Sequence, residues 1–77
     1  MDVRDEGGEL IGTVCVVPAK EGGGREVVLM YRSGGTRSFG DIAALIRELE
    51  RRGAPFEARK RVVSFIAERL TAERRPG

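Results

Sequence analysis

The sequence predicts an α+β domain in which an antiparallel β-hairpin is followed by two α-helices, a ββαα order. Residues 10–17 and 25–32 are two runs rich in β-branched and other apolar residues, and a glycine-rich segment joins them. Two stretches with helical apolar spacing follow, over 38–52 and 55–73. The chain has 77 residues, which suits one small core, so we expect a single compact domain over residues 9–74.

The two ends of the chain offer little to bury. Residues 1–8 are charged and end in two glycines, which indicates a disordered acidic tail. Residues 75–77 indicate a frayed C-terminus.

The first predicted strand, 10–17, is followed by Pro18, and both of its alternating faces are largely apolar. This pattern favours a strand covered on both sides. The glycine-rich segment 19–24 is short enough to make an antiparallel hairpin with 25–32. An isolated two-stranded hairpin is marginal in water, so we expect another subunit to extend or cover the strands, with Val14 and Val16 at that interface.

The first predicted helix begins with Ser38 as its N-cap, and Asp41 lies near the positive helix end. Glu48 and Arg52 are spaced to pair on its outer surface, and Gly53 suits the position just after its end. The apolar stripe of this helix contains Ile42, Leu45, Ile46 and Leu49.

The second predicted helix has an apolar arc of nearly half its circumference. Val62 and Phe65 lie well to the side of the main stripe. A surface helix needs one covered face, so the wider arc indicates a second partner, and we assign Val62 and Phe65 to an oligomer interface. The main stripe contains Phe56, Val63, Ile66, Ala67 and Leu70.

Catalytic and metal-binding chemistry is not predicted. The chain has no His and a single Cys, so a catalytic base, a catalytic pair and a metal-ligand set all lack their usual residues. Cys15 is expected to be a buried small hydrophobe in a reducing cytoplasm. We therefore predict no enzyme activity, no metal and no cofactor.

Charge and composition favour a polyanionic partner. The net charge is +2, yet from Arg25 onward the basic residues outnumber the acidic residues by five. A salt-bridged surface explains the same surplus. The absence of Asn, Gln and His, with many charged residues, is typical of thermophiles, and GC-rich coding in a mesophile is the alternative.

The candidate binding residues gather around segment 31–40. Tyr31 could stack on a base, and Arg37 with the glycine-rich amides before the helix could hold a phosphate. Phe39 is more typical of a core position, and an ordinary strand-to-helix turn explains the segment equally well. The full predicted nucleic-acid site contains Tyr31, Arg32, Gly34, Gly35, Arg37, Phe39, Arg47 and Arg51.

The order of strands and helices over residues 10–73 resembles the ThermoDBP-related archaeal single-stranded DNA-binding proteins in organisation, without a shared diagnostic motif. That resemblance implies an oligomer with a basic, aromatic-lined groove, to which we assign Tyr31, Arg32 and Arg37 from their own chemistry. The sequence therefore predicts a cytoplasmic, homo-oligomeric protein that binds single-stranded DNA or RNA and no membrane. A homo-oligomeric interaction or regulatory module without nucleic acid is the alternative.

Overall fold

The computed structural model describes residues 1–19 and 22–73. In these residues an antiparallel sheet of four strands, in chain order, precedes two helices. The predicted α+β class, with strands before helices, is confirmed, but the sheet has four strands rather than two. The elements are β1 (Asp2–Arg4), β2 (Leu10–Pro18), β3 (Arg25–Tyr31), β4 (Thr36–Phe39), α1 (Ile42–Arg51) and α2 (Phe56–Glu73).

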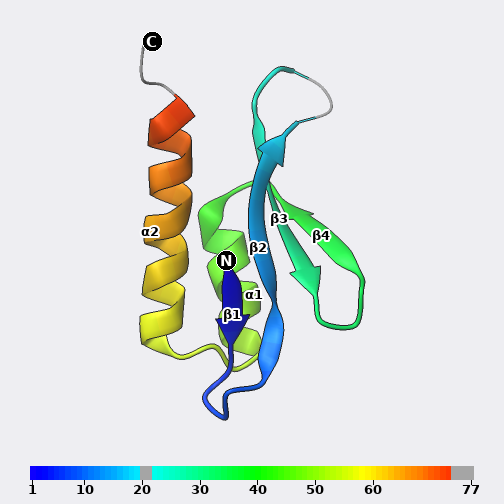
Figure 1. Cartoon of the computed structure of the whole chain (residues 1–77), viewed down its shortest axis with the longest axis vertical. Helices are drawn as coiled ribbons and strands as arrows, with labels where there is room; N and C mark the ends of the chain where they lie inside the picture. Colours follow the sequence, from blue (N-terminus) through cyan, green and yellow to red (C-terminus); the bar gives the residue numbers. More distant parts are fainter. Residues whose placement is uncertain (20–21, 74–77) are drawn as a thin grey trace.

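Both helices lie on the same face of the sheet (Figure 1). The α2 helix lies against β1 and β2, and α1 lies against β4. Residues that pair across strands share a face, and the pair Val14 and Leu29 is fully buried beneath the helices. The buried core contains Val3, Ile11, Val14, Leu29, Phe39, Leu45, Leu49, Ala54, Val62 and Ile66.

The prediction of a disordered tail over residues 1–8 is wrong, because this segment includes the edge strand β1. Val3 pairs with Gly12 and is 1% exposed. The amino group of Met1 donates a hydrogen bond of 2.9 Å to the carbonyl of Val14. A single buried valine and the backbone hydrogen bonds of a short strand therefore order the segment. Its charged composition gives no sign of this strand in the sequence.

The helix start predicted at Ser38 is also wrong. Ser38 belongs to β4 and pairs with Val28, while α1 begins at Ile42 with Asp41 as its N-cap. The Oδ1 atom of Asp41 accepts a 2.7 Å hydrogen bond from the backbone N–H of Ala44. The neighbouring Phe39 is only 7% exposed and pairs with Val27, so burial of its ring favours a strand at this segment.

The end of α1 agrees with the sequence. Gly53 follows the C-cap Arg52 with a φ of +94°, a conformation that glycine adopts without strain. The N–H of Ala54 donates to the carbonyl of Leu49 at 2.9 Å and closes the last turn. This short connection places α2 directly beside α1.

The other face of the sheet has no helix over it among the described residues, so the predicted cover on both faces is not supplied by this chain. Met30 on that face is 48% exposed. Cys15, which we expected to be buried, is half-buried there, with its Sγ 4.0 Å from the Sδ of Met30. In register with these residues, β4 presents the polar Thr36 and Ser38.

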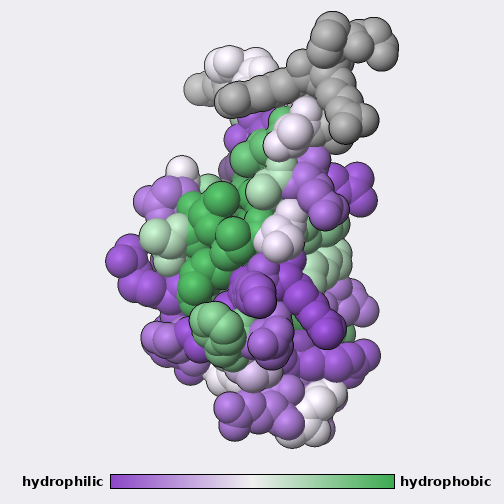
Figure 2. All heavy atoms as spheres, turned by 90° about the vertical axis from the view of Figure 1, so that its left-hand side faces the viewer, coloured by the Kyte–Doolittle hydropathy of each residue, from purple (hydrophilic) through white to green (hydrophobic). Residues whose placement is uncertain are grey.

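The α2 side of the molecule carries exposed apolar side chains. Figure 2 shows hydrophobic residues gathered in a continuous patch on this side, next to hydrophilic ones. Phe56 is 66% exposed and Val63 is 41% exposed. No helix in the described part of the chain is both long and apolar enough to cross a membrane. The predicted frayed end at 75–77 lies outside the described residues.

Candidate nucleic-acid interface

A buried carboxylate on α1 contacts three arginine side chains. Glu48 is 5% exposed. Its Oε1 accepts hydrogen bonds from Nε and Nη2 of Arg51 at 3.1 and 2.7 Å. Its Oε2 accepts from Nε of Arg52 at 2.9 Å and from the hydroxyl of Tyr31 at 2.8 Å. Arg37 completes the set, with Nη1 3.7 Å from Oε1. We call Arg37, Arg51 and Arg52 the arginine cluster.

Helical spacing and sheet register bring these side chains together. Arg51 and Arg52 follow Glu48 by three and four residues, so all three lie on one side of α1. Arg37 in β4 pairs with the buried Leu29, which places it on the helix-covered face. Tyr31 at the end of β3 lies on the same face. The sheet and the first helix therefore both contribute to the cluster.

The three guanidinium groups stay accessible although they share a buried partner. The side chains of Arg37, Arg51 and Arg52 are 57%, 69% and 46% exposed. Three positive groups face one carboxylate, so the arrangement keeps a net charge of +2. A surface of this kind attracts anions, and arginine suits phosphate because it can donate two parallel hydrogen bonds.

The electrostatics fix the protonation state of the central carboxylate. Hydrogen bonds from Arg51, then from Tyr31 and Arg52, lower the pKa of Glu48 to about 2 against the opposing effect of burial. The same contact raises the pKa of Arg51. At neutral pH Glu48 is therefore ionised and holds the arginine side chains in place.

Two arginines of the cluster also lie over aromatic rings. The guanidinium carbon of Arg52 is 4.4 Å from the ring centre of Tyr31, and that of Arg37 is 4.9 Å from the ring centre of Phe39. These cation–π contacts limit how far the arginines can swing. They also occupy one face of the Tyr31 ring. Because its hydroxyl is bonded to Glu48, Tyr31 positions the arginines rather than presenting an open stacking platform.

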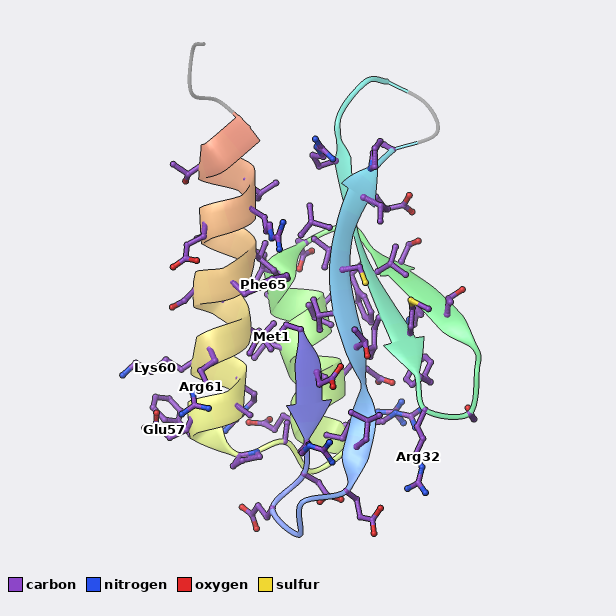
Figure 3. The ribbon with its side chains drawn as sticks, viewed as in Figure 1. Met1, Arg32, Glu57, Lys60, Arg61 and Phe65 are labelled. Atoms are coloured by element: carbon purple, nitrogen blue, oxygen red, sulfur yellow. The ribbon has the colours of Figure 1, made fainter. Side chains whose placement is uncertain are left out.

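The other predicted arginines differ in their surroundings. Arg32 forms a solvent-exposed ion pair with Glu9 at 2.8 Å, and Figure 3 shows it pointing away from the body of the molecule. A depression next to it is lined by Asp5, Glu9, Arg32 and Arg52, among others. The acids there disfavour an anion, so the Arg37 and Arg51 side of the cluster is the more open to phosphate. Arg47 is exposed one helical turn before Arg51.

The predicted phosphate site on helix-start amides does not exist at Gly34 and Gly35. Both glycines lie in the turn between β3 and β4, and the turn uses its own backbone groups. The N–H of Gly34 donates to the carbonyl of Tyr31, and the carbonyl of Gly35 accepts from the N–H of Tyr31. Gly34 has a φ of +103°, which the turn needs. Phe39, the remaining member of the predicted site, is part of the core.

The predicted oligomer contacts are mostly inside the chain's own core. Val14 and Val62 are 0% exposed, so they have no surface to offer a second copy. Val16 and Phe65 are partly buried and pack against the same core. Figure 3 shows Phe65 on the inward side of α2, and the Arg69 guanidinium carbon lies 5.1 Å from its ring centre. The wide apolar arc of α2 is thus explained in large part by this chain's sheet.

Sequence reasoning missed the central role of Glu48. The pairing of Glu48 with Arg52 was predicted and is present, but the prediction of an outer position is wrong because the carboxylate is buried. Its place beside Leu45 and Leu49 on the helix wheel is the signal that could have revealed this. Comparisons of the chain with protein families, curated proteins and solved structures find no match. Function is therefore inferred from the residues themselves.

Proposed function

We propose that the chain is a non-catalytic nucleic-acid-binding protein that holds the phosphates of a single strand with Arg37, Arg51 and Arg52. The observation that carries the proposal is the fixed cluster of exposed guanidinium groups around buried Glu48, with its net charge of +2. Arginines that are already held in place lose little conformational freedom when they bind phosphate. The basic surplus after Arg25 and the resemblance in organisation to ThermoDBP-related proteins support the same proposal.

A single strand suits this cluster better than a duplex. The arginines occupy a short patch, and a flexible backbone can bend to bring successive phosphates to it, whereas a rigid duplex needs a longer positive track. Bases can stack on guanidinium planes as well as on rings. We therefore assign base stacking to the outer faces of Arg37 and Arg52, which the rings of Phe39 and Tyr31 support from behind. A thermophilic source stays a prediction from composition, an archaeal source stays a prediction from the resemblance, and a cytoplasmic location stays a prediction from the single cysteine.

A fluorescence titration with labelled oligo-dT tests the proposal, with a duplex of the same length as comparison. Each phosphate contact to a single strand contributes about 0.7 to the slope of log affinity against log salt, so three contacts predict a slope of about −2. We expect tighter binding of oligo-dT than of the duplex. Absence of binding at low salt, or binding that ignores salt, would contradict the proposal.

The alternative is a homo-oligomeric module without nucleic acid. The exposed Met30 on the open sheet face is the observation that favours it. Sedimentation velocity over a range of concentrations distinguishes the two proposals when the same samples are titrated with oligo-dT. A stable oligomer that binds no oligo-dT supports the alternative.

A further inference from the structure

A second surface lies across α1 from the arginine cluster. Ile46 is about 140° around the helix from Arg51, and it faces α2. There it lines a groove between the two helices together with residues of α2. The complete lining is Ile46, Phe56, Arg59, Lys60, Val63 and Ser64.

The floor of this groove is apolar and exposed. Phe56 and Val63 are 66% and 41% exposed, whereas Ile66 and Val62, about 60° and 100° around α2 from Val63, are fully buried. The apolar arc of α2 therefore continues beyond the part that is buried in the core, and the patch in Figure 2 lies on this side. An exposed aromatic ring with aliphatic neighbours is typical of an interaction site.

The polar edge of the groove is basic and incompletely paired. Lys60 takes part in no salt bridge with any described residue, and Figure 3 shows its side chain pointing outward from α2. Arg59 pairs with Glu50 through Nη1, while its Nε is buried and lacks a hydrogen-bond partner. The accessible donor at this edge is Lys60, and the lining of the groove contains two basic side chains and no acid, so it complements a negatively charged partner.

We propose that the groove binds an acidic amphipathic helix of another protein. A third helix can lay its apolar ridge between two packed helices, with anchors at i, i+3 or i+4, and i+7. Its flanking Asp or Glu side chains would meet Lys60 and Arg59. A second copy of the chain is the competing occupant, and the variants described below distinguish it from an acidic helix.

Fluorescence anisotropy with synthetic helical peptides tests this proposal. The probe has about 16 residues, a length at which an Ala-rich helix becomes marginally stable, with a Leu stripe flanked by Glu. Its matched partner carries Lys at every Glu position. We expect the Glu peptide to bind at least about tenfold more tightly and to weaken as salt rises.

Variants of the protein locate the binding site. Val63→Glu places a carboxylate at an exposed position of the groove floor, and we expect it to weaken binding of the Glu peptide about tenfold or more. Thr36→Glu adds the same charge on the open sheet face, where Thr36 pairs with exposed Met30, and should leave peptide binding unchanged. Oligo-dT binding at the arginine cluster should be unchanged in Val63→Glu, because the groove lies across α1 from that cluster, so the two sites are tested independently.

Several outcomes would overturn the proposal. Equal affinity for the Glu and Lys peptides would show that the groove does not distinguish peptides by charge. If Val63→Glu bound the Glu peptide as tightly as the wild type does, the peptide would bind elsewhere. Absence of peptide binding overturns it as well. A monomer–dimer equilibrium that Val63→Glu abolishes would identify a second copy as the occupant. Loss of oligo-dT binding in Val63→Glu alone, with competition by the peptide, would identify nucleic acid.

Discussion

The hydroxyl of Tyr31 donates a 2.8 Å hydrogen bond to Oε2 of Glu48 and ties the end of β3 to the middle of α1. The same oxygen accepts from Arg52, whose guanidinium lies over the Tyr31 ring. One contact therefore joins the sheet to the helix and also holds an arginine of the proposed binding surface. Stability and binding are coupled through this pair.

Tyr31→Phe should destabilise the fold while it keeps the ring beneath Arg52. The substitution removes a hydrogen bond to a buried charged group, so we expect a loss of about 2 kcal/mol in the free energy of unfolding, measured with urea at neutral pH. Thr13→Val is the matched control, because it removes the exposed bond from the Thr13 hydroxyl to Asp2. Equal losses in the two variants would show that burial of Glu48 adds nothing.

Because of Glu48, the free energy of unfolding should depend on pH in the acidic range. Its pKa lies at about 2 in the fold, below the ordinary value of 4.5, so the folded state favours the ionised form. The stabilisation is fully present above about pH 4.5 and is lost as the pH falls through about 2. The full shift corresponds to at most about 3 kcal/mol, and solvent screening around the exposed arginines lowers this value. The difference in unfolding free energy between the wild type and Glu48→Gln should therefore shrink over this range. A difference that stays constant with pH would contradict the assignment.

Arg51→Ala should weaken nucleic-acid binding by removing one phosphate contact. Arg51 is the most exposed member of the cluster, at 69%. We expect the salt slope for oligo-dT to fall by about 0.7 and the affinity at low salt to fall several-fold. Arg61→Ala is the control, because it removes the same charge from an exposed position on α2 that Figure 3 shows pointing outward. Equal effects would mean that net charge, rather than the cluster, decides binding.

The long elements of this fold could be predicted from the sequence, and the short ones could not. A long element contains enough apolar positions for its period to be recognised, as in the two helices and in the strands predicted over 10–17 and 25–32. The strands β1 and β4 have three and four residues and one buried side chain each, Val3 and Phe39. Their conformation is decided by the neighbouring strand rather than by local pattern.

The candidate site was predicted in part for a related reason. Arg37 and Arg51 could be named from charge alone. That both meet Glu48 depends on the register of β4 and on the packing of α1, neither of which the sequence pattern specifies. Tyr31 was predicted as a stacking surface. An aromatic residue beside arginines can either stack on a base or position the arginines, and the contact of Tyr31 with Glu48 indicates the second role.

Gly12 offers a test of the strand arrangement that the sequence did not anticipate. It lies in β2 opposite Val3 of β1 and Tyr31 of β3. A Cβ atom at this position would come within 2.4 Å of the backbone oxygen of Met30, and backbone cannot move aside as a flexible side chain can. Gly12→Ala should therefore cost about 3 kcal/mol in unfolding free energy, measured by urea denaturation. Gly24→Ala is the control, since nothing lies within 4 Å of a Cβ there. If Gly12→Ala were as stable as Gly24→Ala, the close approach of β2 and β3, and with it the position of Tyr31 against Glu48, would be wrong.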